Sequence, residues 1–459
     1  MKNDASVCEM ALNGEKAAGL PEGIDLNDFY AYMPQHNYIY IPTRELWPAS
    51  SVNSRIEPIP VLGPNGKPVV DGNGKEKTTP AATWLDRNRP VEQMTWAPGE
   101  PELILGRHIA EGGWIERKGV ACFNLYRPPT IIRGDASKIT PWLDHVYTVY
   151  GQDTDHIIRW LAHRVQHPEV KINHALVLGG SQGIGKDTLL EPVKHAVGPW
   201  NFSEVSPQQV QGRFNGFLKS VILRISEARD LGDIDRFKFY DHMKAYTASP
   251  PDVLRVDEKY RNEHNILNCT GIIITSNYKT DGIYLPPDDR RHYVAWSDRT
   301  KEEFSKEYWI DLWSWYRNGG IQNVTAYLAE YDLSNFDAKA PPPKTPAFWD
   351  IIDANRAPED AELADVLDDL HSPAAITIDR IGTAATGDFQ MWIRDRKNRR
   401  KIPHRLERCG YVLVRNDDAK DGLWKINGTR QAVYSRTDLS VSDRTRAASQ
   451  LTGAGQCSK

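Results

Sequence analysis

Three short apolar runs lie in the middle of the chain, and each one ends in glycine or polar residues. Residues 174–178, 221–225 and 271–274 are rich in valine, leucine and isoleucine. Short apolar runs bounded by such residues predict β-strands. The first run leads through a glycine-rich loop into a helical pattern, so this part of the chain is predicted to be an α/β core.

Helical patterns flank this core on both sides. Residues 140–150 and 155–166 precede it, and residues 302–331 follow it. Further upstream, from residue 29 to residue 129, short β-rich pieces alternate with turns, among them a Gly- and Lys-rich loop at 66–77. The chain is therefore predicted to carry a β-rich region before the α/β core.

The loop after the first apolar run has the spacing of a phosphate-binding loop. Gly180, Gly185 and Lys186 match the pattern G-x-x-x-x-G-K. In such a loop the backbone N–H groups and the helix N-terminus hold a polyphosphate, and the lysine reaches its terminal phosphates. The alternative is a glycine turn before an ordinary helix. The residues predicted to contact the nucleotide are Gly180, Ser181, Gln182, Gly183, Ile184, Gly185, Lys186, Asp187 and Thr188.

Two positions depart from the usual motifs for magnesium. Asp187 follows the lysine where Ser or Thr is usual, and Ser226 stands where the second strand usually ends in its first carboxylate. Carboxylate and hydroxyl oxygens are both hard ligands, so we hypothesise that the two have exchanged places around Mg²⁺. Thr188 and Glu227 complete the predicted metal ligands, and Glu227 is the predicted general base that activates water.

Polar residues after the third strand complete the candidate site. Asn277 can position the attacking water beside the γ-phosphate, although asparagine after a strand is also a common turn residue. Arg290 and Arg291 offer guanidinium groups to the charge on the transferred phosphoryl group, in the same subunit or a neighbouring one. The alternative is a surface ion pair with Asp288 and Asp289.

Taken in this order, the motifs resemble the superfamily 3 helicase domain of phage, prophage and poxvirus-type primase-helicases. The segments 160–169 and 123–129 are similar to the lead-in of that family, and the resemblance covers residues 120–300. It implies an AAA+-like core that uses ATP and Mg²⁺, forms a homo-oligomeric, hexameric ring and translocates on DNA. It also implies arginine fingers that act across subunit interfaces.

The family carries a DNA-contacting hairpin between the acidic strand and the asparagine. This chain offers Lys244, Arg255, Lys259 and Arg261 at the matching place, and these are the predicted DNA contacts. Basic side chains can neutralise phosphates, and Tyr260 can stack on a base. The alternative is a solvated turn, because two carboxylates in the same stretch cancel part of its charge.

The C-terminal part combines a linker with a basic module. The proline-rich run 341–346 predicts a linker. An acidic helix is expected at 357–371, and its charged side chains are predicted to face solvent. Residues 391–436 then hold 13 Lys or Arg against 5 Asp or Glu. Their helix and strand pattern resembles a small winged helix that places a basic helix on DNA. A packing domain with a solvated basic face is the alternative.

Composition narrows the class of protein. The chain has 459 residues, a formal net charge of −4 and 40% hydrophobic residues, so a nucleic-acid surface must be local. Five cysteines form no C-x-x-C pair, which is typical of a reduced cytoplasm and disfavours a zinc site. Neither a membrane span nor a secretion signal is predicted. The expected location is cytoplasmic, in the bacterial host if a phage or prophage encodes the chain.

These observations give one leading function with two alternatives. We expect an ATP-dependent DNA helicase that acts in phage or mobile-element replication, with replication proteins among its partners. A loader or remodeller without unwinding activity is the first alternative, and a degenerate nucleotide-gated DNA-binding protein is the second. The predicted parts are a mobile N-terminus (1–25), a β-rich N-terminal region (26–130), a helical lead-in (131–170), a P-loop NTPase/helicase domain (171–335), a Pro-rich linker (336–350), a basic winged-helix-like domain (351–440) and a mobile tail (441–459).

Overall fold

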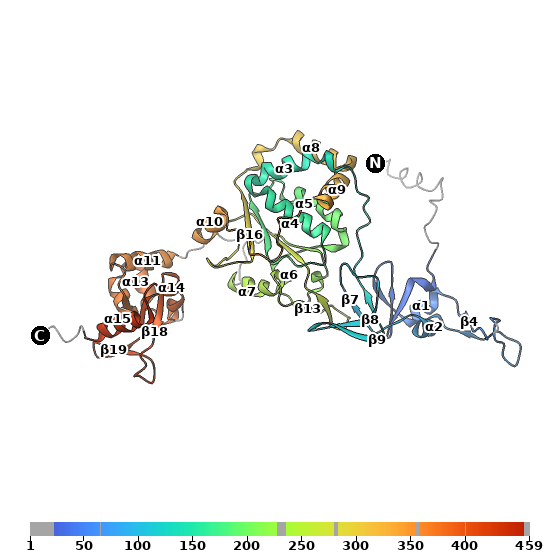
Figure 1. Cartoon of the computed structure of the whole chain (residues 1–459), viewed down its shortest axis with the longest axis horizontal. Helices are drawn as coiled ribbons and strands as arrows, with labels where there is room; N and C mark the ends of the chain where they lie inside the picture. The colour runs from blue at the N-terminus through green and yellow to red at the C-terminus, as the bar shows by residue number, and fades with distance from the viewer. Residues whose placement is uncertain are drawn as a thin grey trace, which may run out of the picture. The chain divides into compact units, whose positions relative to one another are not determined.

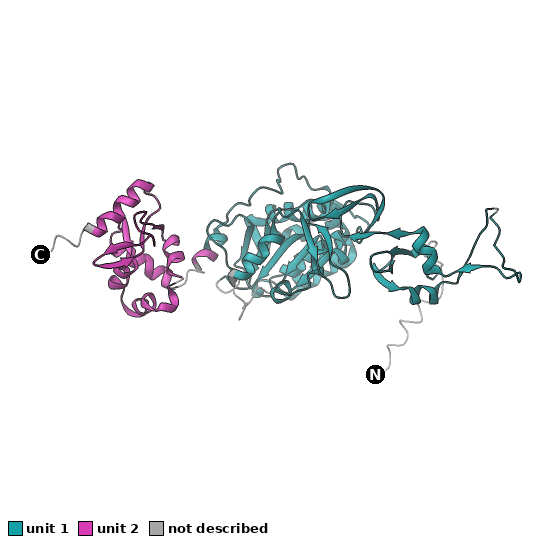
Figure 2. Ribbon diagram, turned by 90° about the horizontal axis from the view of Figure 1, so that it is seen from below, with its two compact units in different colours: residues 1–350 teal, residues 351–459 magenta. Residues whose placement is uncertain are grey.

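The computed structural model describes residues 23–453, except 65, 227–235, 280–282, 355–357 and 400. The chain divides into two compact units, residues 1–350 and residues 351–459, which Figure 2 colours separately. In the described part of the chain, no helix has both the length and the apolar character needed to cross a bilayer.

A five-stranded parallel sheet forms the centre of the first unit. Its strand order is β11-β12-β15-β10-β16, and every neighbouring pair is parallel. The strands are almost wholly buried, as expected for a parallel sheet covered on both faces. This confirms the predicted α/β core. The strands are β10 (Ala175–Gly180), β11 (Phe202–Val205), β12 (Ile222–Ile225), β15 (Gly271–Ser276) and β16 (His292–Ser297).

Helices pack on this sheet and are held to neighbouring segments by hydrogen bonds (Figure 1). The Trp142 indole donates a hydrogen bond to the Leu189 carbonyl at 3.0 Å, and Trp160 donates to the His174 carbonyl at 3.2 Å. Buried indoles need such partners, so each one fixes a helix against the core. The helices are α3 (Thr140–Tyr150), α4 (Thr154–Gln166), α5 (Lys186–Val197), α6 (Pro207–Val210), α7 (Arg236–Thr247), α8 (Lys306–Trp315) and α9 (Ile321–Glu330).

An antiparallel hairpin is inserted between β12 and β15 in the chain. It consists of β13 (Val253–Val256) and β14 (His264–Leu267), paired from Val253 with Leu267 to Val256 with His264. Its position along the chain is that of the hairpin expected from the sequence. The hairpin follows helix α7 in the chain and lies beside the strands of the N-terminal region (Figure 1).

The N-terminal region is built from small sheets and two short helices. Phe29, Tyr38 and Leu85 are fully buried and form the centre of one apolar cluster. The sheet orders are β3-β2-β1-β6 and β7-β9-β8, with a separate β4-β5 pair. The elements are β1 (Phe29–Tyr32), β2 (Asn37–Tyr40), β3 (Glu45–Pro48), α1 (Ala49–Arg55), β4 (Ile59–Pro60), β5 (Thr78–Thr79), α2 (Ala81–Asn88), β6 (Pro90–Val91), β7 (Gln93–Thr95), β8 (Leu103–Ala110) and β9 (Gly113–Asn124).

The segment predicted as a free linker, 336–350, is in part bound to the core. The Ala338 carbonyl accepts a hydrogen bond from the Asn173 backbone at 2.8 Å, and Thr345 donates to the Val294 carbonyl at 2.6 Å. Helix α10 (Pro346–Ala354) begins inside the expected linker. The prediction failed because the proline content indicates only that the segment is stiff. It does not indicate which backbone groups of the core can hydrogen-bond to the segment.

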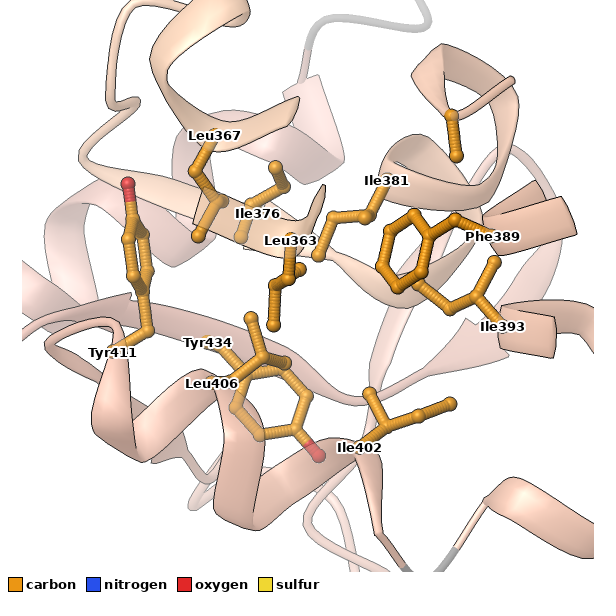
Figure 3. Close-up of a cluster of buried hydrophobic side chains, with 11 residues drawn as sticks. Leu363, Leu367, Ile376, Ile381, Phe389, Ile393, Ile402, Leu406, Tyr411 and Tyr434 are labelled. Carbon is orange, nitrogen blue, oxygen red and sulfur yellow. The ribbon is translucent and has the colours of Figure 1, made fainter. Parts of the chain in front are cut away.

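The second unit is a small α/β module with its own core. Its three-stranded antiparallel sheet has the order β17-β21-β18, beside a β19-β20 hairpin. Figure 3 shows the buried side chains that helices and strands contribute, among them Leu363, Ile376, Phe389 and Leu406. The elements are α11 (Pro358–Asp369), β17 (Ala375–Thr377), α12 (Ile378–Ala384), α13 (Gly387–Arg394), α14 (Ile402–Arg408), β18 (Tyr411–Val414), β19 (Trp424–Ile426), β20 (Thr429–Gln431), β21 (Val433–Arg436) and α15 (Val441–Gly453).

Two expectations about this unit are wrong. Residues 441–453, predicted as part of a mobile tail, form helix α15, on which Ala448 is fully buried in a cluster with Trp424 and Val433. The acidic helix does not turn all its charges to solvent, because Asp360 is buried and forms ion pairs with Arg405 and Arg408. Both errors arise from partners distant in the sequence, which local composition does not show.

Candidate functional site

The glycine loop between β10 and α5 has a conformation that requires glycine. Gly185 caps helix α5 with a φ of +91°, and a Cβ atom there would lie 2.5 Å from Cε1 of His145. Nε2 of the same histidine donates a hydrogen bond to the Gly185 carbonyl at 3.0 Å. Side chains at this position are therefore excluded both by backbone strain and by contact. The loop leaves the N-terminus of α5 open for an anion.

Lys186 lies at the centre of this loop. Its Nζ atom donates to the carbonyls of Gly180 and Ser181 at 2.6 and 2.8 Å, and to Oδ1 of Asn277 at 2.8 Å. Burial lowers the pKa of Lys186 to about 8. The structure thus brings together the predicted lysine, at the start of α5, and the predicted asparagine, directly after β15.

A cavity of about 470 Å³ opens over the loop. Five of its lining residues had no assigned role in the sequence analysis. Trp309 and Trp313, one helical turn apart on α8, are the large apolar residues of the lining. The cavity is lined by Gln182, Gly183, Gly185, Lys186, Asp187, Thr188, Glu204, Arg224, Ser226, Thr275, Asn277, Trp309 and Trp313.

Arg224 is the most informative of the residues that sequence reasoning missed. Its guanidinium forms an ion pair with Asp187 and lies 3.8 Å from a carboxylate oxygen of Glu204, its neighbour on β11. The Arg224 side chain is 11% exposed, whereas that of Asp187 is 71% exposed. A single arginine inside the apolar run 221–225 was the available signal, because a charge on a buried strand needs a partner.

Of the remaining predicted metal ligands, two line this cavity and one lies outside the described residues. Ser226 and Thr188 line the same cavity as Asp187. The backbone carbonyl of Thr188 accepts a hydrogen bond from the Tyr316 hydroxyl at 2.9 Å. Glu227, the predicted general base, lies outside the described residues. Oxygen ligands from the loop and from the second strand therefore face one cavity, and these donors fit a hard divalent cation.

Arg290 and Arg291 do not reach this cavity. In the β10–β16 pair Ala175 faces His292 and Gly180 faces Ser297, so the arginines precede β16 at the end of the sheet opposite to the loop. Six residues of strand place the two ends roughly 17 Å apart. The arginines instead line a second cavity, of about 460 Å³, with Tyr240 and Lys244.

The surface ion pair given above as the alternative for these arginines is not formed in the second cavity. The Asp289 carboxylate is buried and accepts hydrogen bonds from the Tyr240 hydroxyl at 2.8 Å and the Arg291 backbone N–H at 3.0 Å. A third contact, with the His292 ring, helps to lower the pKa of Asp289 to about 2, against the effect of burial. Within the described chain neither Arg290 nor Arg291 has a carboxylate partner.

The predicted DNA contacts are distributed over two elements. Lys244 lies on α7, 2.6 Å from an Asp241 oxygen, and Arg255 on β13 pairs with Glu263. Lys259 and Arg261 occupy the turn between β13 and β14. Arg261 approaches Glu258 and also donates to the backbone of the N-terminal region. Of the four, Lys259 alone has no carboxylate partner among the residues that the structure describes.

Comparison with known proteins adds a structural relative. Residues 178–291 match a protein-family model described as a family of unknown function, DUF5906. The apo structure of the NrS-1 C terminal region superimposes with a TM-score of 0.60 at 15% sequence identity, covering 89% of this chain and 95% of that one. This chain has the fold of the NrS-1 C terminal region. The family match begins within β10 and ends at Arg291, so it contains the glycine loop, Asn277 and both arginines.

Two further solved structures align with this chain. The A form of the NrS-1 C terminal region gives a TM-score of 0.57 at 14% identity over 89% of this chain and 96% of that one. A JCV Helicase structure aligns at 11% identity over 57% of this chain and 68% of that one, with a TM-score of 0.31, which is too low to establish a shared fold. The search of curated proteins found no match.

The lowered pKa of Lys186 predicts that polyphosphate binding depends on pH. A lysine with a pKa of about 8 is charged below that pH and neutral above it, whereas an ordinary lysine stays charged to about pH 10.4. We expect the affinity for a fluorescent ATP analogue to fall as the pH rises from about 7 to about 9, by at most about tenfold per pH unit.

Two variants test the cause of this dependence. Asn277→Asp places a carboxylate beside Nζ and is expected to move the midpoint to higher pH. Lys186→Met is expected to bind weakly and without this dependence. An affinity of the natural chain that stays constant from about pH 7 to about pH 9 would contradict the assignment.

Proposed function

We propose that this chain is an ATP-dependent DNA helicase of the superfamily 3 type that acts in phage or mobile-element DNA replication. The observation that carries the proposal is the contact between Lys186 of the glycine loop and Asn277 at the carboxyl edge of a parallel sheet. Ligands of such sheets bind at the carboxyl ends of the strands, where a loop and a helix N-terminus meet. The fold shared with the NrS-1 C terminal region is compatible with this proposal.

In this proposal the cavity over the loop holds ATP with magnesium. Lys186 and the loop amides bind the phosphates, and the indoles of Trp309 and Trp313 border the base. Asp187, Thr188, Ser226 and Glu227 hold the cation, which neutralises phosphate charge when it is bound. Glu227 activates the attacking water and Asn277 orients it. Asp187 exchanges its ion pair with Arg224 for the cation.

Arg290 and Arg291 act on the nucleotide of a neighbouring subunit. They lie too far from the glycine loop of their own chain to contact a nucleotide bound there. Among the described residues neither guanidinium has a carboxylate partner, and such groups are suited to phosphate charge. This role requires a homo-oligomer, which we propose to be a hexameric ring. Lys244 lines the same cavity and is then close to the same interface.

DNA is the proposed partner of the hairpin and of the second unit. Lys259 and Tyr260 are exposed at the hairpin turn. The second unit has the order helix, strand, three helices, strand, hairpin, strand and helix. This order is compatible with a winged helix that carries two added helices, α15 among them. Arg405 and Arg408 are occupied by Asp360, so the exposed cations that remain for DNA include Arg396, Lys397 and Arg399.

Magnesium-dependent ATP hydrolysis by the purified chain tests the proposal first. We expect turnover that single-stranded DNA stimulates, and a loss of at least about a hundredfold in Lys186→Ala because the charge that positions the phosphates is removed. Lys138→Ala, which changes an exposed lysine outside the cavity, is the matched control.

The outcomes separate the proposed function from its alternatives. Strand displacement on a forked substrate supports a helicase, and turnover without displacement supports a loader or remodeller. Absence of turnover with retained DNA binding would support a nucleotide-gated binding protein, for which the Asp187–Arg224 ion pair is the favouring observation.

A reciprocal swap tests the exchanged metal ligands. Asp187→Ser removes a proposed ligand and should raise the magnesium concentration needed for half-maximal hydrolysis about tenfold or more. Adding Ser226→Asp returns a carboxylate from the second strand and should restore the requirement. The hypothesis is wrong if Asp187→Ser leaves both the requirement and the turnover unchanged, or if only metal-free nucleotide binding changes.

Mixing of two inactive variants tests the arginines. Lys186→Ala subunits keep the arginines, and Arg290→Ala or Arg291→Ala subunits keep the nucleotide cavity. If an arginine acts across subunits, mixed assemblies regain hydrolysis that neither preparation shows alone, and the arginine whose variant complements is the finger. Hydrolysis that remains at the level of the separate preparations, in assemblies shown to have exchanged subunits, would contradict a role across subunits.

A further inference from the structure

The hairpin is joined to the N-terminal region, and a third cavity, lined by charged residues, lies at this junction. Thr95 donates to the Asn265 carbonyl at 2.8 Å, and Arg261 donates to the Arg44 carbonyl at 3.1 Å. The cavity measures about 270 Å³ and shares no lining residue with the cavity over the glycine loop. The residues that matter here are Arg44, Arg127, Lys219, Arg261, Glu258 and Trp200.

Cations outnumber carboxylates in this cavity. Four basic side chains line it, and Glu258 is the single carboxylate of the lining. One oxygen of Glu258 accepts from Lys219 at 2.5 Å and lies 3.4 Å from Arg261. Its charge is therefore taken up by two cations on its own side of the cavity. No carboxylate of the lining is left for Arg44 and Arg127.

These two arginines keep unused donors. Arg44 binds Glu102 through Nη2 at 2.8 Å, while its Nε and Nη1 atoms are buried and have no hydrogen-bond partner among the residues that the structure describes. Arg127 donates to the Pro42 carbonyl at 2.9 Å and has no carboxylate partner in the described part of the chain. Burial and the neighbouring Arg44 charge lower the pKa of Arg127. A bound anion would relieve the repulsion between the two guanidiniums.

We propose that this cavity binds a backbone phosphate of single-stranded DNA. Its volume suits a single phosphate group better than a whole nucleotide, since ligand sites usually begin at about 300 Å³. The proposal deepens the DNA-binding part of the proposed function and rests on it. It assigns that contact to Arg44 and Arg127, which belong to the N-terminal region rather than to the hairpin.

Aromatic rings near the cavity favour a polynucleotide over free phosphate. Trp200 is 38% exposed and lies under Arg127, whose guanidinium carbon is 4.7 Å from the ring centre. Tyr260, at the turn of the same hairpin, is 85% exposed, with Nζ of Lys259 4.9 Å from its ring. Cations interleaved with exposed rings are the usual means of holding a single strand, because every base offers a face for stacking.

The salt dependence of DNA binding measures this contact. Each phosphate neutralised on a single strand contributes about 0.7 to the slope of log K against log salt concentration. We expect fluorescence anisotropy with a labelled oligothymidylate to show a slope smaller by about 0.7 for Arg127→Gln than for the natural chain. Arg55→Gln, an exposed arginine of the same region outside the cavity, should leave the slope unchanged.

A second variant guards against a folding defect in Arg127→Gln. Thr43 is exposed and lines the same cavity, so Thr43→Glu adds a negative charge without removing a buried side chain. It should weaken DNA binding at low salt. Slopes and affinities that stay unchanged in both variants, while the natural chain binds DNA, would overturn this proposal alone.

Two further outcomes separate the possible failures. If the natural chain binds no oligothymidylate, the DNA partner of the proposed function fails, and this proposal fails with it. Calorimetric titration with inorganic phosphate addresses a free anion as the ligand. Phosphate binding that disappears in Arg127→Gln, together with an unchanged DNA slope, would assign the cavity to a free anion and overturn the assignment to DNA.

Discussion

The parallel register of β10 between β15 and β16 is the constraint on which the rest of the core depends. Pairing of Gly179 with Ser276 brings the end of β15 to the start of the glycine loop, which lets Lys186 reach Asn277. Pairing of Ala175 with His292 puts Arg290 and Arg291 at the opposite edge. A parallel ladder cannot shift by a few residues without moving both sets, because the buried side chains on each face are tied to the register. One backbone arrangement therefore determines which polar groups share a cavity and which face away from it.

Charge inside the cavity over the loop is balanced by pairs that a ligand can replace. Lys186 is held by two carbonyls and an amide oxygen, all neutral, and the effect of burial exceeds the opposing effect of the nearby Asp187 charge, so the pKa of Lys186 falls. Arg224 is held by Asp187, which is itself largely exposed. The contacts of Lys186 and of Arg224 both differ from a structural ion pair, in which both partners are usually buried. Phosphates would compensate Lys186 and Arg224, and a cation would compensate Asp187, which is the electrostatic reason for proposing a nucleotide with magnesium in this cavity.

Elsewhere in the chain, charges that look available in the sequence are used for packing. Asp360 of the acidic helix is buried against Arg405 and Arg408 and joins α11 to α14. Glu258 joins the hairpin turn to Lys219 of the core. Each pair removes cations from a surface that composition alone would assign to nucleic acid. The net charge of a segment therefore overstates its free charge, and the difference matters most in the basic second unit and in the hairpin.

The sequence by itself determined the α/β core, the position of the glycine loop and the order of the three strands. These depend on local patterns, namely apolar runs, glycine spacing and the polar residues at strand ends. Gln182, Gly183 and Gly185 of the loop line one cavity with Lys186, Asp187, Thr188, Ser226 and Asn277, whereas Gly180, Ser181 and Ile184, which were predicted beside them, are not part of its lining. Only the tertiary structure showed Arg224 at that cavity, the distance of Arg290 and Arg291 from it, the folding of 441–453 as a helix and the charged junction around Arg44 and Arg127. Each of these depends on groups far apart in the chain that meet through sheet register or burial, and neither leaves a periodic signal in the sequence.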